Sequence, residues 1–194
     1  MKGQLILLRH GESLGNATRR FTRTHHAPLT PKGEAQARAA GERIRSGFRP
    51  VSVISSPYRR ARQTAAIVAE MLGLGAALEI ETELREQSMG DLHGQPYEAA
   101  LSSPGFDRLP RWEWRPPGGE TLIDVQARAV PAILGIAARH PASPVVIVSH
   151  AGTIQSVWAH SAGSWKRARG VPNAGLLIVP HDGLRLGPPT LLED

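Results

Sequence analysis

With 194 residues, of which 41% are hydrophobic and 21% are charged, the chain is long enough for one well-buried domain and too apolar to be disordered. Because it contains no cysteine, disulfides, thiol nucleophiles and Cys-based zinc sites are excluded. Its net charge of +6 favours acidic partners such as phosphate esters, nucleic acids or anionic surfaces.

The apolar segments are short. Only four apolar residues, 5–8, come directly before Arg9, and four are too few for the core of a signal peptide. No later apolar run approaches the roughly 18 residues of a membrane span. We therefore expect a cytoplasmic protein that does not bind membranes.

Apolar strand-like runs and helical segments alternate along the chain. In chain order we expect a strand over 4–8, a helix over 30–46, a strand over 51–55, a helix over 56–73, a short strand over 78–80, a helix over 121–140, a strand over 145–148, a short helix from about 152, a strand over 175–179 and a tail over 181–194. Thr30-Pro31 and Ser56-Pro57 each offer an N-cap followed by a proline suited to the first helical turn. The alternation predicts the α/β class, with a mostly parallel central sheet in a three-layer α/β/α arrangement.

The segment before the third long helix has a different character. Residues 84–118 contain five prolines and show no clear periodicity. We see no internal repeat and no linker that would separate domains. We therefore expect one domain over 1–194, with 87–118 as a lid or rim inserted into it.

Basic or imidazole side chains follow three of the expected strands. In chain order they are Arg9 and His10, then Arg59, Arg60 and Arg62, then His150. Ligands bind at the carboxyl ends of strands in open α/β sheets, so we expect these groups to converge. Arginine offers phosphate a charged bidentate fork, and imidazole can attack phosphorus or carry a proton.

The arginines after the second strand oppose local helix electrostatics. Arg59, Arg60 and Arg62 fall in the first turns of a helix, where the macrodipole disfavours cations. A bound dianion reverses that preference, because helix amides and arginines then bind it together. At least one of the three is expected to be a solvated surface residue, and helical spacing alone does not choose between Arg59 and Arg60.

A phosphoryl-transfer site also needs a proton donor for the leaving alkoxide. Glu86 lies in the irregular segment and could serve, although chemistry alone does not single it out among the 17 acidic residues. The small residues of His150-Ala151-Gly152 would let an anion approach backbone N–H groups closely.

Six blocks in order resemble the histidine phosphatase superfamily, in its phosphoglycerate-mutase-like branch. They begin with Leu-Arg-His-Gly-Glu-Ser over 8–13 and include Ser-x-x-x-x-Arg-Ala-x-Gln-Thr-Ala over 55–65; the others lie at 28–37, 84–94, 117–121 and 148–152. The resemblance implies the phosphoglycerate-mutase-like fold. It also implies a metal-independent phosphoryl transfer that uses no cofactor.

The resemblance assigns roles to the residues already singled out. It implies that His10 is the nucleophile, that Arg9, Arg60 and His150 clamp the phosphate, and that Glu86 is the general acid and base. Asn16 and Thr22 match positions that line the phosphate or substrate pocket. Glu120 falls on a recurrent Gly-Glu motif, to which we give no mechanistic role.

The chain departs from the family pattern at positions that we place on the pocket rim. His25 and His26 stand where many members carry an acid, Arg23 replaces a frequent glycine, and His93 replaces an acid or tryptophan. These departures bear on the substrate rather than on the chemistry. We disfavour a metal site made of the three histidines, because adjacent histidines rarely chelate one ion together, and we expect no metal.

Three functions remain to be weighed. Family mutases carry a long insertion between the acid and the second histidine to keep out water, whereas only 63 residues, 87–149, separate Glu86 from His150 here. We therefore expect a phosphatase acting on small phosphomonoesters, with a cofactor-dependent phosphoglycerate mutase as the alternative.

A non-enzymatic phosphate- or nucleic-acid-binding module is the third function. The positive charge and the pair Trp112 and Trp114 suggest nucleic-acid binding with base stacking. Such a module would not need the two histidines and Glu86, so their presence would go unexplained. We expect the two tryptophans to cover the pocket or to pack as ordinary hydrophobic residues. The expected partner is a small-molecule phosphate ester and not a nucleic acid, and a homodimer is the candidate assembly.

Overall fold

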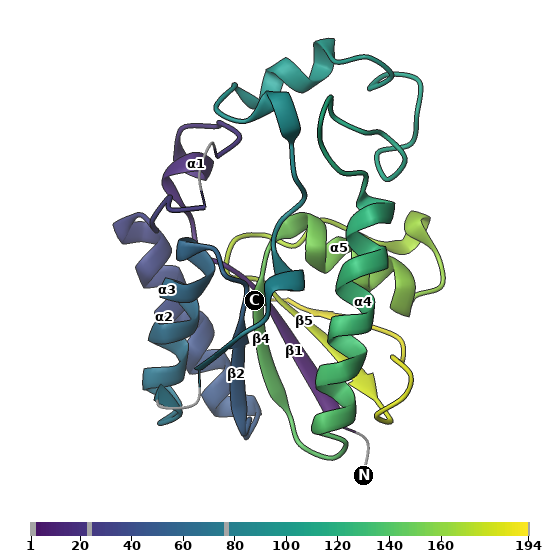
Figure 1. Cartoon of the computed structure of the whole chain (residues 1–194). Helices are drawn as coiled ribbons and strands as arrows, with labels where there is room; N and C mark the ends of the chain where they lie inside the picture. The colour runs from purple at the N-terminus through teal and green to yellow at the C-terminus, as the bar shows by residue number, and fades with distance from the viewer. Residues whose placement is uncertain (1–2, 23–24, 76–77, 194) are drawn as a thin grey trace.

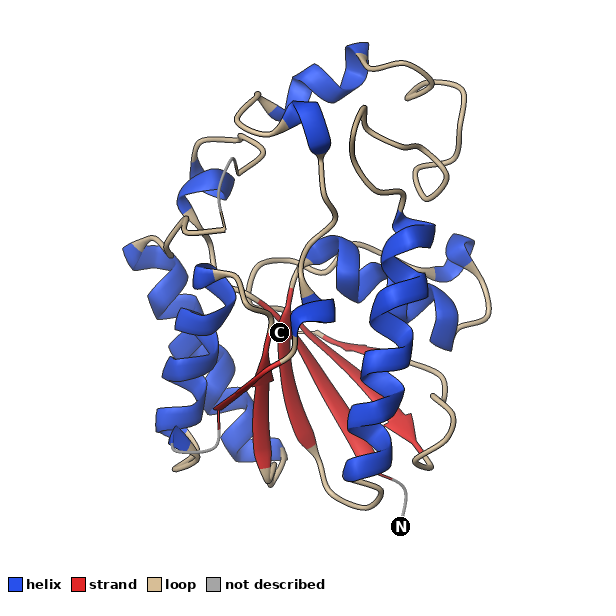
Figure 2. Ribbon diagram, in the orientation of Figure 1, coloured by secondary structure: helices blue, strands red, loops and turns tan. Residues whose placement is uncertain are grey.

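A six-stranded sheet lies at the centre of the computed structural model, which describes residues 3–22, 25–75 and 78–193 (Figures 1 and 2). Arg23 lies outside these residues. The strands are β1 (Gly3–Arg9), β2 (Ser52–Ser55), β3 (Leu78–Ile80), β4 (Val145–Ser149), β5 (Leu176–His181) and β6 (Thr190–Leu192). The α-helices are α1 (Leu14–Ala17), α2 (Pro31–Gly47), α3 (Arg59–Met71), α4 (Leu122–Arg139) and α5 (Ala151–Ser161).

The strand order is β3-β2-β4-β1-β5-β6. The first four strands of this order are parallel to one another, β5 pairs antiparallel with β1, and β6 pairs antiparallel with β5. The mostly parallel sheet is therefore confirmed. The prediction that 181–194 is only a tail is wrong, because Leu191 and Leu192 pair with β5 and pack against the core, and three residues are too short to show a strand period.

Apolar side chains of β1 alternate between the two faces of the sheet, as the pleat of a strand requires. Leu5 and Leu7 belong to the core cluster that contains Ile133 of α4 and Ile154 of α5. Ile6 and Leu8 belong to the other cluster, with residues of α2 and α3. Helices α2 and α3 thus cover one face and α4 and α5 the other, which confirms the three layers (Figure 1).

Two of the helix starts follow the expected cap chemistry. The Thr30 side chain accepts a hydrogen bond from Gly33 N at the start of α2, with Pro31 in the first turn. Thr121 and Asp124 form a reciprocal capping box at the start of α4. Each cap satisfies backbone N–H groups that the helix itself leaves unpaired.

The predicted cap at Ser56 is wrong. Helix α3 begins at Arg59, and Tyr58 holds the cap position without a side-chain hydrogen bond. The Ser56 hydroxyl lies instead 2.7 Å from Nε2 of His150. A fully buried imidazole needs a polar partner, and that tertiary requirement outweighs a local cap.

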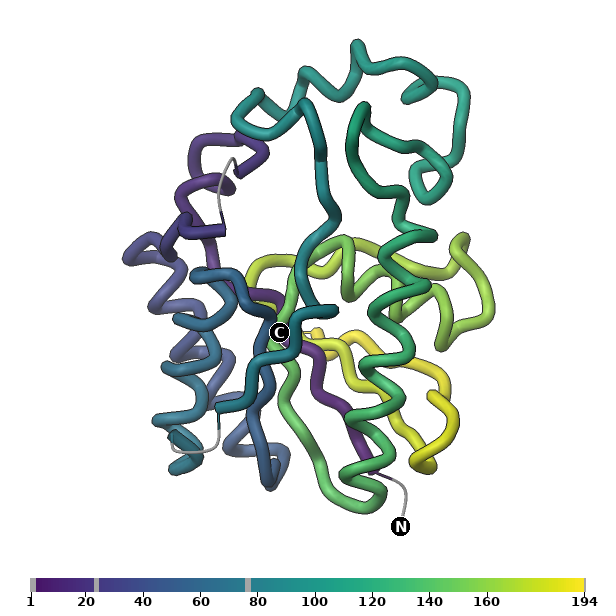
Figure 3. The backbone as a smooth tube through the Cα atoms, in the orientation of Figure 1, coloured from purple at the N-terminus to yellow at the C-terminus, as the bar shows by residue number. Residues whose placement is uncertain are grey.

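Residues 81–120 carry the chain beyond the carboxyl ends of the parallel strands and back to α4 (Figure 3). The segment contains short 3-10 helices at Thr82–Leu84, Gly90–Leu92 and Tyr97–Ser102. Across the described part of the chain, no helix combines the length and the apolar character that crossing a membrane requires.

Candidate active site

Strands β2, β4 and β1 are neighbours in the sheet, so the three groups expected at their carboxyl ends do lie together. Arg9 is the register partner of Ser149, and His10 N donates a hydrogen bond to Ser149 O at 3.0 Å. Ser56 N donates to Val148 O at 2.9 Å. These backbone contacts place His10, His150 and the start of α3 at one edge.

A cavity of about 700 Å³ opens at this edge. Six of the seven predicted site residues line it: Arg9, His10, Asn16, Thr22, Arg60 and Glu86. The seventh, His150, is fully buried behind the lining, with its ring centroid 5.1 Å from that of His10. The structure therefore brings the whole predicted set together.

His10 is buried and held at both ring nitrogens. Its Nδ1 lies 2.6 Å from Gly11 O, and its Nε2 accepts a hydrogen bond of 3.0 Å from Arg60 Nε. A carbonyl oxygen accepts only from an N–H, so Nδ1 carries the proton and Nε2 carries the lone pair. Burial above all, then the charges of Arg60 and Arg9, holds the pKa of His10 well below its ordinary value. At neutral pH the ring is therefore uncharged, which is the form that can attack phosphorus.

His150 precedes the first turn of α5 as its N-cap residue. Its Nε2 faces the Ser56 hydroxyl, and the oxygen of that hydroxyl already accepts a weak hydrogen bond of 3.3 Å from Tyr58 N. The hydroxyl proton is then free to point at Nε2, which leaves the ring proton on Nδ1. Burial, followed by the charges of Arg60 and His10, keeps the pKa of His150 well below its ordinary value.

Arg60 settles the choice between the two neighbouring arginines. It is 6% exposed and reaches His10, whereas Arg59 and Arg62 are exposed. The Arg60 guanidinium lies 5.0 Å from the Tyr58 ring centroid, a cation–π distance. Arg9 also reaches inward, with one guanidinium nitrogen donating to Val171 O at 2.7 Å.

Three buried donors around His10 have no protein partner among the described residues. They are Arg9 Nε, Arg60 Nη1 and His150 Nδ1. Buried polar atoms in proteins are nearly always hydrogen-bonded, and those that are not call for a ligand or a water. Three donors and two cationic side chains beside a neutral imidazole suit a phosphate group.

Glu86 reaches the site from the loop after β3 and rests on the start of α5. One of its carboxylate oxygens accepts from Gln87 N at 2.9 Å and from Gly152 N at 3.1 Å. A Cβ at position 152 would lie 2.6 Å from that oxygen, so glycine is needed for the approach.

The rim residues take different places. His25 and His93 line the cavity, and the His26 ring packs tilted against that of His25, with ring centroids 4.1 Å apart. No group of three or more histidine, cysteine or acidic side chains in the described ranges is arranged to hold a metal. Trp114 is buried and Trp112 stacks on Trp165, so both tryptophans pack as ordinary hydrophobic residues.

Sequence reasoning missed several residues of the site. Ser56 is predicted to be a helix cap, and Tyr58 is not singled out. Asn173 donates both to His10 O at 3.0 Å and to Asn16 Oδ1 at 3.3 Å, yet it lies far from both along the chain. Arg111 lines the cavity from the inserted segment. None of these residues belongs to a local pattern that would have marked it.

Arg60→Ala tests whether this arginine serves ligand binding rather than folding. We expect the melting temperature without ligand to stay the same or rise slightly, because the change removes a buried cation from the positive end of α3. The rise in melting temperature on adding vanadate or phosphate should shrink strongly. Arg60→Lys should restore it only in part, since lysine lacks the bidentate fork.

Arg62→Ala is the matched control, because Arg62 is an exposed arginine of the same helix. It should change neither the melting temperature nor the response to oxyanions. Arg60 would be structural if Arg60→Ala strongly destabilised the protein and yet left the vanadate response normal.

Comparisons with known proteins agree with this geometry. The family model described as histidine phosphatase superfamily (branch 1) matches residues 5–185. A glucosyl-3-phosphoglycerate phosphatase of Mycobacterium tuberculosis is 32% identical over 186 residues, which cover 88% of this chain and 82% of that protein. A 2,3-bisphosphoglycerate-dependent phosphoglycerate mutase of a Methylobacterium species is 39% identical over 137 residues, covering 68% of this chain and 66% of the mutase.

The fold is similar to a solved structure of the first kind of enzyme. A mycobacterial glucosyl-3-phosphoglycerate phosphatase complexed with VO3 superposes with a TM-score of 0.83 at 30% identity, and the match covers 98% of both chains. The likeness therefore extends beyond the six sequence blocks to nearly the whole chain.

Proposed function

Since this chain belongs to the histidine phosphatase superfamily and is a phosphomonoester hydrolase of that type, we propose that it hydrolyses small phosphate esters through a phosphohistidine at His10. The observation that carries this proposal is the set of buried, unpartnered donors around the neutral His10 ring. Residues 1–194 act as one catalytic domain, and 87–118 act as its lid.

The first step transfers the phosphoryl group to the protein. His10 Nε2 attacks phosphorus, the N–P bond forms, and the P–O bond to the leaving group breaks. The protonated Glu86 carboxyl gives its proton to the departing oxygen. The hydrogen bond from Arg60 Nε to His10 Nε2 breaks when the guanidinium turns to the phosphate oxygens, which frees the lone pair for attack. Arg9, Arg60 and His150 then stabilise the charge on those oxygens.

The second step hydrolyses the phosphohistidine and regenerates free His10. The Glu86 carboxylate takes a proton from water, and the resulting hydroxide attacks phosphorus as the N–P bond breaks. Inorganic phosphate leaves, and His10 and the protonated Glu86 are ready for another cycle. Fixed cationic side chains supply the charge stabilisation in both steps, so the proposal needs no metal.

The inserted segment supports a substrate with a second negative charge. Arg111 lines the cavity, with its guanidinium 4.1 Å from the Phe106 ring centroid and 5.0 Å from that of Trp114. The described residues offer the Arg111 guanidinium these two ring faces but no hydrogen bond or ion pair. A carboxylate elsewhere on the phosphate ester would provide one, and the phosphoglycerate part of the relatives' named substrates contains such a group.

An assay of paired substrates tests the function and separates it from the mutase alternative. We expect phosphate release from 3-phosphoglycerate or phosphoserine to exceed that from glycerol 3-phosphate or phosphoethanolamine, which lack the carboxylate. Release should need no bisphosphoglycerate, because only 63 residues, 87–149, are available to exclude water between Glu86 and His150. Isomerisation to 2-phosphoglycerate in the presence of bisphosphoglycerate should be negligible beside it.

The same assay has two outcomes that would overturn the proposal. Efficient isomerisation with little phosphate release would identify a mutase. No release from any phosphomonoester, together with salt-dependent retardation of nucleic acid in a gel, would favour the non-enzymatic binding module.

A further inference from the structure

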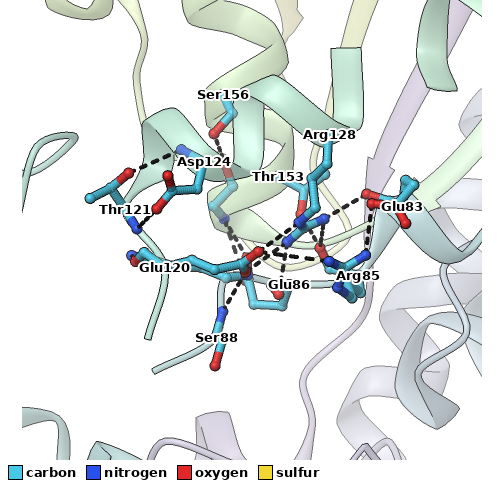
Figure 4. A network of polar contacts seen from close by, with 12 residues as sticks. Glu83, Arg85, Glu86, Ser88, Glu120, Thr121, Asp124, Arg128, Thr153 and Ser156 are labelled. Atoms are coloured by element: carbon cyan, nitrogen blue, oxygen red, sulfur yellow. Dashed lines mark hydrogen bonds and ion pairs between the residues drawn. The ribbon is translucent and has the colours of Figure 1, made fainter. Parts of the chain in front are cut away.

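Arg128 of α4 uses every hydrogen-bond donor that its side chain has, although it does not itself line the cavity. Its guanidinium binds both carboxylate oxygens of Glu120, at 2.9 and 3.0 Å. The remaining three N–H groups donate to main-chain oxygens of Glu83, Arg85 and Glu86, at 2.6, 2.9 and 3.1 Å. Figure 4 shows this side chain between α4 and the 83–86 loop.

Glu120 holds the same loop from the other side of Glu86. Its Oε2 accepts from Ser88 N at 2.9 Å, and its main-chain oxygen accepts from the Gln87 side chain at 2.6 Å. Burial raises the pKa of the Glu120 carboxyl, but hydrogen bonds from Arg128 and Ser88 outweigh that effect and keep it below its ordinary value. The pair is therefore ionised at neutral pH.

The Arg128 side chain is only 11% exposed and that of Glu120 is 22% exposed. An ion pair with this burial adds little net stability on its own account, because desolvation offsets much of the attraction. Its geometry is more specific than stability needs, since all five donors of Arg128 find acceptors. The pair also contacts the chain on both sides of one residue, Arg128 before it and Glu120 after it. That residue is Glu86.

We propose that the Arg128–Glu120 pair positions Glu86 for proton transfer, so that Arg128 is a positioning residue for the reaction. The inference rests on the proposed function, in which Glu86 is the general acid and base. Arg128 fixes the Glu86 main chain, and Gly152 N fixes its carboxylate. With both ends held, the carboxylate has one direction in which to reach the leaving oxygen.

Leaving-group dependence separates positioning from simple structural support. Arg128→Lys keeps the charge but supplies three donors from a single nitrogen, so it cannot hold Glu120 and three carbonyls at once. We expect kcat/KM for an alkyl phosphate to fall by about 10- to 100-fold, a part of the general-acid contribution. The value for 4-nitrophenyl phosphate should fall much less, because that leaving group needs no proton. Inhibition by vanadate should be unchanged, because the oxyanion donors are not touched.

Glu120→Gln is the second variant and removes the negative half of the pair with little change in shape. It should show the same leaving-group pattern, and it keeps the proposal testable if Arg128→Lys folds poorly. Arg139→Met is the matched control, since Arg139 lies on the same helix and pairs with Glu79 at an exposed site, at 2.7 Å. It should leave both substrates and vanadate inhibition unaffected.

A double mutant tests whether Arg128 acts through Glu86. In a Glu86→Gln background, Arg128→Lys should cost nothing further on the alkyl phosphate, because the group that it positions is already gone. Additive losses, or equal losses on alkyl and aryl phosphates, would show that Arg128 is merely structural. If Glu86→Gln itself lacked leaving-group dependence, the assignment of the acid would fail instead, so the two failures are distinguishable.

Discussion

His10→Ala is expected to abolish phosphate release. Loss of a covalent nucleophile costs on the order of 10⁶-fold in kcat in comparable enzymes, because no other group can take over the bond to the transferred atom. His10 is the imidazole whose Nε2 lone pair adjoins the unpartnered donors of Arg60 and His150. The measurement is turnover of a phosphomonoester, beside mass spectrometry of protein quenched in alkali, which preserves phosphohistidine.

The wild-type protein should carry phosphate on His10 during turnover, and the variant should carry none. His160→Ala is the control, because His160 is an exposed histidine of α5 that lies outside the cavity. It should keep full turnover and the label on His10. Substantial turnover by His10→Ala, or a label on another residue, would contradict the mechanism.

Glu86→Gln is expected to lower kcat/KM for alkyl phosphates by roughly 10²- to 10⁴-fold. The amide keeps an oxygen for the hydrogen bonds from Gln87 N and Gly152 N, but it cannot transfer a proton. The kcat/KM for 4-nitrophenyl phosphate should fall far less, because its leaving group departs as an anion. The parameter to compare is kcat/KM, which reports the phosphorylation step even where hydrolysis of the phosphohistidine limits kcat.

Glu83→Gln serves as the control from the same loop. Its side chain bonds Arg85 at 2.7 Å and does not line the cavity. We expect it to affect alkyl and aryl phosphates alike and only slightly. Equal large losses of kcat/KM on both substrates in Glu86→Gln would remove Glu86 from the role of acid.

The parts of the fold that could be predicted are those written in local patterns. The four-residue apolar run over 5–8, the cap at Thr30 and the buried run over 145–148 each appear in the structure where they were expected. The convergence of His10, Arg60 and His150 followed because carboxyl ends of adjacent parallel strands share an edge.

The parts that could not be predicted depend on partners distant in the chain. Helical spacing could not choose Arg60 over Arg59, because the choice rests on which side of α3 meets His10. The sequence around Ser56 predicts a cap, because no local pattern indicates the imidazole that it binds 94 residues later. Asn173 likewise meets Asn16 across a separation of 157 residues.

The first residues of α5 contact two different parts of the site. His150 is its N-cap residue. Two residues later, Gly152 N donates a hydrogen bond to the Glu86 carboxylate. Under the proposed mechanism, a displacement of the helix would carry the phosphate-holding imidazole and, through Gly152 N, the carboxylate of the proton donor together. Their mutual spacing therefore depends on the first three residues of this helix start as well as on the loop that Arg128 holds.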